Sequence, residues 1–326
     1  MTPDPVGGGT SPSSGKASPA PSVSMAGFDD GTGPEADRVA ADIDRACTEV
    51  GFFGVVDHGI DGDLAPAALD AARRLFARPL DVKQRWAVAT PPGLQRGYVG
   101  LGGEAQAAAV GEETPPDLSE TYSVGSVRPQ PGGLWAIGDT WPDGDVPGFR
   151  DAWVAWRAAA DALARSVLRA CALAVTGQAD AFDHMVTRPL GGLRANHYPA
   201  LDGPPATGQW RGGAHTDYGT VTILATDGRA GLEIEVEPGE WRPTEAPTGG
   251  FLVNIGDLLA LQTGGRWRST WHRVRVPDGA PPHPARTSLA FFQFPNPECA
   301  IAGLEVPTAG DYLRLKVARI AAAGAN

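Results

Sequence analysis

Two short segments of the chain carry side chains of the types that bind metal ions. His215 and Asp217 lie in GGAHTDYGT, immediately before the β-rich run TVTILAT. In an extended segment, residues two apart point to the same side, so this imidazole and this carboxylate face one point. His272 lies in RSTWHRVRV, on a second strand-like run. Two histidines and one carboxylate leave the other positions of a metal ion open, which is the ligand set of non-haem iron(II) centres.

A strand-like run further along the chain adds to this signal. Alternate positions of ARTSLAFFQF share one strand face and combine a cation, a hydroxyl and apolar groups: Arg286, Ser288, Ala290, Phe292 and Phe294. A guanidinium fork beside a hydroxyl is suited to a carboxylate. If Arg286 is buried, it needs an anion to offset its desolvation, and both a ligand carboxylate and a protein carboxylate are candidates.

The other histidines have less specific interpretations. His58 follows an apolar run and is expected to serve a turn, and His184 lies in a polar helical stretch. His283 lies in PPHPA and is expected in an exposed loop. His197 alternates with its neighbours and is expected to point away from them.

The second half of the chain must position these residues with strands. Short β-rich runs separated by turns predict a sandwich or barrel, namely LRANHYPA, TVTILAT, LEIEVE, FLVNIGDLLAL, WHRVRVP and TSLAFFQF. The first half reads differently: helical periodicity is found from residue 36 to 50, from 63 to 76 and from 149 to 175, with a buried strand at 51–60. Residues 90–147 are rich in Gly and Pro and predict loops with short strands, and a last helix is expected at 309–322. The predicted fold class is mostly β with flanking α, a jelly-roll core buttressed by N-terminal and central helices.

The composition predicts one large domain behind a tail. Residues 1–27 are Pro, Gly and Ser with little to bury, so a disordered tail is expected. Residues 28–326 are expected to form a single domain, with a helical and loop region at 28–180 and the jelly-roll catalytic core at 181–326.

Bulk properties restrict the partners and the compartment. The formal net charge of −11 disfavours nucleic acid and anionic membranes as partners. Three scattered cysteines argue against a disulfide scaffold and suit a cytoplasmic protein. No apolar run approaches the roughly 20 residues of a membrane span, and the start lacks a signal-peptide pattern. The sequence assigns no oligomeric state, and a monomer is compatible with it.

With these motifs in hand, the chain resembles a known family. HTDYGTVTIL, GDLLALQTGGRWRSTWHRV and RTSLAFFQF, in this order, resemble the isopenicillin N synthase-like branch of the iron(II), 2-oxoglutarate-dependent oxygenases. GFFGVVDHGI, DLSETYSVG and RANHYP resemble further elements of that family, so the similarity runs from about residue 50 to 320. The loop at 263–265 reads Thr-Gly-Gly where the family often has Asn-Gly. The resemblance implies a double-stranded β-helix, the jelly-roll core expected above.

The resemblance also implies cofactors and residue roles. Iron(II), where O2 reacts, would be held by the metal-binding candidates His215, Asp217 and His272. Four residues would contact the co-substrate 2-oxoglutarate, with its distal carboxylate held by the first two: Arg286, Ser288, Tyr198 and Asn196. The activity would be dioxygenase chemistry on a small molecule, by hydroxylation, desaturation or ring formation, in specialised metabolism.

Substrate contacts are less sharply indicated. Phe292 and Phe294 are expected to line the pocket. Four further candidates are equally compatible with ordinary packing or surface charge: Arg96, Tyr98, Tyr122 and Arg194. The substrate itself cannot be read from the sequence.

Three other functions are compatible with parts of the pattern. Some relatives use the same triad without 2-oxoglutarate, as oxidases of the isopenicillin N synthase type. Two histidines and an aspartate also suit zinc, so a zinc hydrolase is a further alternative. A silent ligand-binding homologue is the third, and the intact triad with Arg286 and Ser288 speaks against it.

Overall fold

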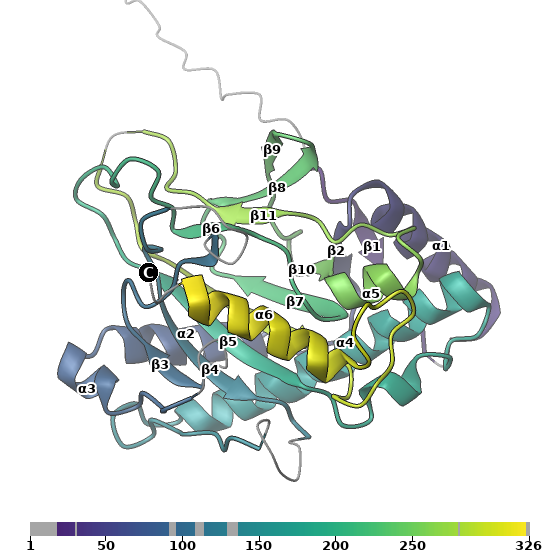
Figure 1. Ribbon diagram of the computed structural model, residues 1–326, viewed down its shortest axis with the longest axis horizontal. Helices are drawn as coiled ribbons and strands as arrows, with labels where there is room; N and C mark the ends of the chain where they lie inside the picture. The colour runs from purple at the N-terminus through teal and green to yellow at the C-terminus, as the bar shows by residue number, and fades with distance from the viewer. Residues whose placement is uncertain are drawn as a thin grey trace, which may run out of the picture.

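Two β-sheets packed face to face form the core of the protein (Figure 1). The computed structural model describes residues 18–29, 31–90, 96–107, 114–128, 136–279 and 281–323. The large sheet has eight strands, in the order β1 (Ser22–Ser24), β2 (Phe52–Val56), β10 (Phe251–Ile255), β7 (Val221–Thr226), β12 (Arg286–Gln293), β5 (Gly191–Tyr198), β4 (Glu120–Gly125) and β3 (Gly97–Val99). The small sheet has four, in the order β6 (Gly212–His215), β11 (His272–Val274), β8 (Leu232–Glu237) and β9 (Glu240–Pro243). An apolar cluster joins the sheets, with Phe52 and Leu252 from the large one and Ile234 and Val274 from the small one.

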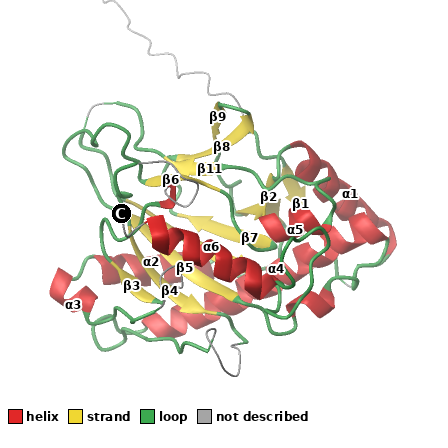
Figure 2. Cartoon of the chain, viewed as in Figure 1, coloured by secondary structure: helices red, strands yellow, loops and turns green. Residues whose placement is uncertain are grey.

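Helices flank the strands, as predicted (Figure 2). They are α1 (Gly33–Glu49), α2 (Leu64–Phe76), α3 (Leu80–Gln84), α4 (Phe149–Thr176), α5 (Asp257–Gln262) and α6 (Ala309–Ala323), with a 3-10 turn at Asp183–Val186. α4 packs against α1, α2 and the strands β7 and β12. Trp153 and Trp156 of α4 are fully buried, which confirms that the long helix belongs to the core. No described helix is long and apolar enough to cross a membrane.

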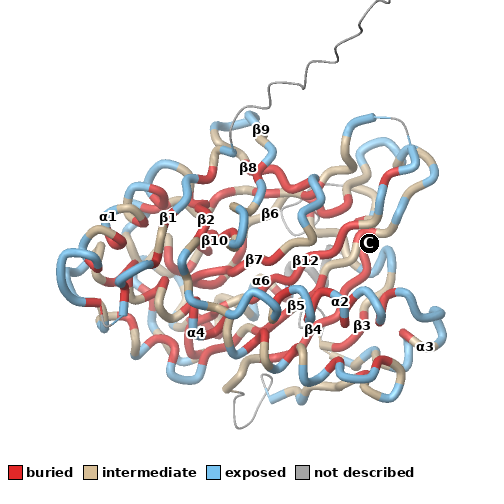
Figure 3. Tube along the Cα trace, turned by 180° about the vertical axis from the view of Figure 1, so that it is seen from behind, coloured by how far each residue is buried: buried red, intermediate tan, exposed pale blue. Residues whose placement is uncertain are grey.

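The strands of the large sheet have two different faces. Leu193, Ala195 and Leu289 point toward the helices and are fully buried in the main apolar cluster. Their neighbours point toward the small sheet, because side chains alternate along a strand. Figure 3 shows that buried residues concentrate along the strands of this sheet. The large sheet therefore borders the helical core on one face and the space between the sheets on the other.

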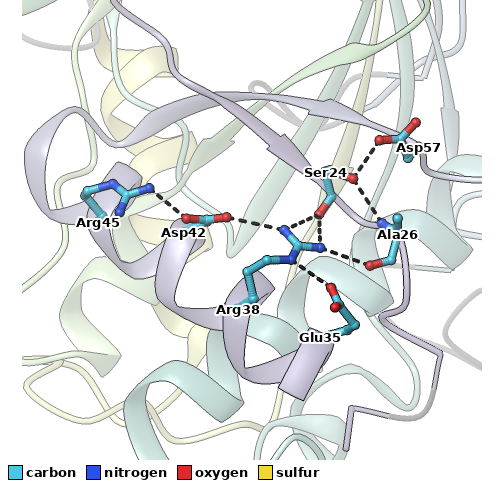
Figure 4. Close-up of polar contacts among 7 residues, drawn as sticks. All are labelled: Ser24, Ala26, Glu35, Arg38, Asp42, Arg45 and Asp57. Atoms are coloured by element: carbon cyan, nitrogen blue, oxygen red, sulfur yellow. Dashed lines mark hydrogen bonds and ion pairs between the residues drawn. The ribbon is translucent and has the colours of Figure 1, made fainter. Parts of the chain in front are cut away.

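The segment from residue 18 to 27, expected to be disordered, has a defined structure. Residues 1–17 lie outside the described residues, but Ser22–Ser24 form β1, which runs parallel to β2 with Val23 opposite Val55. Val23 is buried. Arg38 of α1 fastens the segment by donating hydrogen bonds to the carbonyl oxygens of Ser24 and Ala26 (Figure 4). Backbone hydrogen bonding at a sheet edge needs few apolar residues, so composition alone placed the start of the ordered chain too late.

Candidate metal centre

The structure brings His215, Asp217 and His272 together between the sheets. His215 ends β6 and lies directly opposite His272 at the start of the antiparallel strand β11. Asp217 follows where the chain crosses toward β7 of the large sheet. Oδ1 of Asp217 lies 3.9 Å from Nε2 of His215 and 3.8 Å from Nε2 of His272. One ligand atom from each residue lies within 4.8 Å of the other two, so the three could hold one metal ion.

Both imidazoles are oriented by backbone carbonyl groups. Nδ1 of His215 donates to the carbonyl oxygen of Gly213 at 2.9 Å, and Nδ1 of His272 donates to that of Thr270 at 3.1 Å. A carbonyl oxygen only accepts, so each ring carries its proton on Nδ1 and keeps the lone pair of Nε2 toward Asp217. Metal-binding histidines characteristically have such a support for the second nitrogen.

Asp217 is held in the same way. Its Oδ2 accepts hydrogen bonds from Oγ1 of Thr222 at 2.6 Å and Nδ2 of Asn254 at 2.7 Å, which leaves Oδ1 facing the imidazoles. Burial opposes its ionisation, but the two histidines and these two donors together lower the pKa of Asp217. Burial, then the nearby His272, lowers the pKa of His215 to about 4. An ionised carboxylate and a neutral imidazole are the forms that bind a metal ion.

The backbone at Asp217 is fixed by the start of α5. The amide of Asp257 donates to the carbonyl oxygen of Asp217 at 2.8 Å, and the amide of Gly256 donates to that of Thr220 at 2.9 Å. A Cβ atom on residue 256 would lie only 2.4 Å from the carbonyl oxygen of Gly219. Only glycine at 256 therefore allows this close approach of two backbone segments.

The carboxylate of Asp257 links the same region to the C-terminal helix. It accepts hydrogen bonds from Oγ of Ser269 and from the hydroxyl of Tyr312, both at 2.6 Å. Nζ of Lys316 lies 3.3 Å from it. Tyr312 and Lys316 belong to α6, so the last helix of the chain is tied to the segment that supports Asp217.

A buried arginine lies on the same side of the large sheet. Arg286 is 2% exposed, its Nε donates to the carbonyl oxygen of Arg229 at 3.1 Å, and Nη1 lies 3.4 Å from Oγ of Ser288. The ring of Tyr198, opposite Arg286 in the register of β5 and β12, lies 5.4 Å from the guanidinium carbon. Among the described residues, Arg286 makes no ion pair with a carboxylate. A buried cation with a hydroxyl and without a protein anion fits a ligand carboxylate.

Two of the predicted substrate contacts also face the space between the sheets. Asn196 lies opposite Ser288, which places Arg194 and Asn196 on the same face. Nε of Arg194 donates to Oδ1 of Asn196 at 2.8 Å, and its Nη2 pairs with Glu104. Phe292 lies opposite Thr222, the residue bonded to Asp217, and is partly exposed. These side chains form a polar wall with one aromatic surface.

Tyr98 and Tyr122 are placed elsewhere, contrary to the prediction. Thr121 lies opposite Asn196, so its neighbour Tyr122 points to the helices, as does Tyr98 opposite Tyr122. The hydroxyl of Tyr122 donates to the carbonyl oxygen of Thr140 at 2.6 Å. Both tyrosines belong to the main apolar cluster. The direction of these side chains depends on the pairing of β4 with β5, which the sequence does not give.

Phe294, Arg96 and His283 also differ from expectation. Phe294 lies beyond the end of β12, where strand alternation stops, and packs in the main apolar cluster. Arg96 lies against Gly125 at the far end of β4. His283 is 6% exposed and pairs with Leu201, so the expected exposed loop is wrong there.

Several residues that support the site were not predicted. Asn254 carried a signal, because it is a polar residue inside the apolar run FLVNI. Thr222 carried none although it is only five residues from Asp217, because the turn that brings the two together is a property of the fold. Glu104 and Arg211 carried none, since their partners Arg194 and Pro284 are distant in sequence.

Comparisons with known proteins agree with this geometry. Residues 20–143 match the family model for the non-haem dioxygenase in morphine synthesis N-terminal domain, and residues 190–295 match that of the 2OG-Fe(II) oxygenase superfamily. Validamycin A dioxygenase of Streptomyces hygroscopicus subsp. limoneus is 32% identical over 275 residues, 82% of this chain and 74% of that protein. Proline hydroxylase buaE of Petromyces alliaceus is 30% identical over 266 residues, 79% of this chain and 82% of its own.

A solved structure has the same architecture. A full-length protein of Neurospora crassa, crystallised in complex with alpha-KG and thymine, superposes with a TM-score of 0.79 at 29% identity, covering 93% of this chain and 96% of that one. The likeness confirms the expected double-stranded β-helix core with flanking helices.

Proposed function

Because this chain belongs to the iron(II)- and 2-oxoglutarate-dependent oxygenases, we propose that His215, Asp217 and His272 are its iron ligands. It is a non-haem iron dioxygenase that uses 2-oxoglutarate and O2 to oxidise a small molecule. The observation that carries the ligand assignment is the convergence of three ligand atoms within 4.8 Å. The polar atoms of these side chains that face away from this point are all hydrogen-bonded.

The chain supplies position and charge rather than the oxidant. When bound, iron and 2-oxoglutarate supply the oxidising power, since 2-oxoglutarate and O2 give succinate and CO2 as the substrate is oxidised. The carbonyl groups of Gly213 and Thr270 keep both Nε2 atoms unprotonated. Thr222 and Asn254 keep Asp217 ionised and fixed. The ligands are thus set before the metal arrives.

Arg286 and Ser288 are proposed to hold the distal carboxylate of 2-oxoglutarate, with Tyr198 and Asn196 beside them. The support is the burial of Arg286 without a carboxylate partner in the described chain. A charged ligand group would offset the cost of that burial and accept from both the guanidinium and the hydroxyl.

The substrate is proposed to be a small polar molecule of specialised metabolism, bound against Arg194, Asn196 and Phe292. Arg194 and Asn196 offer hydrogen bonds, and Phe292 offers a partly exposed ring. Relatives named for validamycin A and for proline act on molecules of this polar kind. The oxidation of this substrate is proposed to be a hydroxylation, a desaturation or a ring closure. The acidity and the three free cysteines support a cytoplasmic enzyme without nucleic-acid or membrane partners.

Anaerobic titration tests the assignment. Iron(II) followed by 2-oxoglutarate is expected to give a weak visible charge-transfer band in the wild type, and succinate should form with turnover in air. Arg286→Ala should raise the Kd for 2-oxoglutarate at least tenfold, about 1.4 kcal/mol. Arg242→Ala, which removes an equal charge from exposed β9, is the matched control. Protein that retains zinc and gives no band would contradict the proposal.

A further inference from the structure

A second buried arginine lies beside Arg286. Arg211 precedes β6 and is 1% exposed. Its Nη2 donates to the carbonyl oxygen of Pro199 at 3.2 Å and to that of Pro284 at 2.7 Å. Pro199 directly follows Tyr198 at the end of β5, and Pro284 lies two residues before Arg286 at the start of β12. One guanidinium therefore fastens the two strand ends that carry the proposed carboxylate contacts.

Within the part of the chain that the structure describes, no carboxylate is bonded to Arg211. Among the described residues it makes no ion pair, and its buried Nε has no hydrogen-bond partner. The negative charge of Asp227 raises the pKa of Arg211, but this carboxylate is shared with two other arginines. Its Oδ2 lies 3.5 Å from Nη2 of Arg73 and 3.7 Å from Nε of Arg229. Oδ2 of Asp227 also accepts from the amide of Thr287.

This region is therefore cationic in an otherwise acidic chain. Arg73 and Arg229 pair with Asp227, and the charges of Asp227 and Arg286 both shift the pKa of Arg211, although the net charge of the protein is −11. Burial and the neighbouring charge of Arg286 lower the pKa of Arg211, as expected for two close cations. Removing two like charges from water is unfavourable unless an anion enters between or beside them.

We propose that Arg211 is a positioning residue for the co-substrate: it holds the ends of β5 and β12 and supplies the second positive charge that selects 2-oxo acids with a distal carboxylate. This inference rests on the proposed function of Arg286. Arg211 acts through Arg286 and Tyr198, by fixing their strand ends and by raising the positive potential where the carboxylate binds. The ligand class is a five-carbon 2-oxo dicarboxylate.

Two probes of equal chain length separate charge from shape. Calorimetric titration of manganese-loaded protein is done with 2-oxoglutarate and with 2-oxopentanoate, which lacks the distal carboxylate. Arg211→Gln should raise the Kd for 2-oxoglutarate about tenfold, equivalent to about 1.4 kcal/mol. The same variant should change the Kd for 2-oxopentanoate less than about twofold. Arg211→Lys, which keeps the charge, should recover most of the affinity and the salt dependence of binding.

The control variant is Arg268→Gln. Nη1 of Arg268 also donates to two backbone carbonyl oxygens, those of Glu49 and Val236, but these lie away from the proposed carboxylate contacts. Its Kd for 2-oxoglutarate should equal that of the wild type.

The outcomes distinguish failure of the role of Arg211 from failure of the proposed function. An equal loss of both 2-oxo acids in Arg211→Gln would reduce Arg211 to a structural clamp, and an unchanged Kd for 2-oxoglutarate would remove it from the site. If Arg211→Gln does not fold, the lysine variant decides, since loss of its selectivity between the two probes overturns the charge role. Failure of the wild type to bind 2-oxoglutarate would instead overturn the proposed function.

Discussion

The two faces of the large sheet are made by the same strands and do different work. On β5, Leu193 and Ala195 are fully buried against the helices, while Arg194 and Asn196, which alternate with them, face the small sheet with hydrogen-bonded polar groups. β7 has the same division, with Ile223 in the core and Thr222 bonded to Asp217. The candidate site therefore lies on one face of a sheet whose opposite face is tightly packed, which gives its side chains a rigid support. Substitutions on the two faces should separate chemistry from stability.

The largest effect is expected at the metal centre. Asp217→Ala removes the proposed ligand that faces both imidazoles, so activity should fall by at least about a thousandfold, roughly 4 kcal/mol. Bound iron should fall to background, while the metal-free protein should lose only about 1–3 kcal/mol of stability, because Thr222 and Asn254 are left without their acceptor. Succinate release, metal analysis and circular dichroism measure the three quantities, with exposed Asp202→Ala as the control. Full iron binding by Asp217→Ala would remove it from the ligand set.

The opposite face should respond in stability alone. Trp153 is fully buried, and its Nε1 donates to the carbonyl oxygen of Ala68 at 3.1 Å. Trp153→Ala should lower the free energy of unfolding by about 3–5 kcal/mol because it leaves a large cavity. Urea unfolding measures this, and the Kd of the folded fraction for 2-oxoglutarate at low temperature should stay at the wild-type value. A selective loss of that affinity would break the division between the faces.

The residues on these two faces also show which parts of the candidate site could be predicted from the sequence. The triad was predictable because His215 and Asp217 are local neighbours, and Arg286 because alternation places it with Ser288. Tyr122 was misplaced because its direction follows from the register of β4 on β5, a tertiary property. Arg211 could not be predicted for a related reason: its hydrogen-bond acceptors are carbonyl oxygens at two other strand ends.

A smaller effect tests the reassignment of Tyr122. Its hydroxyl donates a partly buried hydrogen bond to the carbonyl oxygen of Thr140 and lies 3.2 Å from Oγ1 of the same residue, and its ring packs edge-on against Trp153. Tyr122→Phe keeps the ring, so the free energy of unfolding should fall by only about 1 kcal/mol. KM for substrate and for 2-oxoglutarate should not move. A several-fold rise in substrate KM without loss of stability would return Tyr122 to the pocket.

The smallest effect concerns pH and the helix side of β5. Burial lowers the pKa of His197, whose ring stacks on Phe76 and whose Nδ1 lies 2.9 Å from Oγ1 of Thr287. Below the usual value of 6.5, the unfolded chain takes up a proton that the folded protein resists, so stability should fall as the pH drops through this range. Urea midpoints measured from pH 7.5 to 5.5 should fall less steeply in His197→Gln than in the wild type. Exposed His184→Gln should follow the wild-type curve.

The bond between Asp257 and the C-terminal helix bears on how the enzyme matures. Tyr312 and Lys316 lie far beyond Asp217 in the sequence, yet they hold the carboxylate of the residue whose amide holds Asp217. Until α6 packs against this region, the segment at Asp257 lacks this support, because the contact joins residues that are distant in sequence. The proposed iron ligand Asp217 therefore reaches its final position only when α6 has docked, so iron binding is expected to follow the packing of this helix.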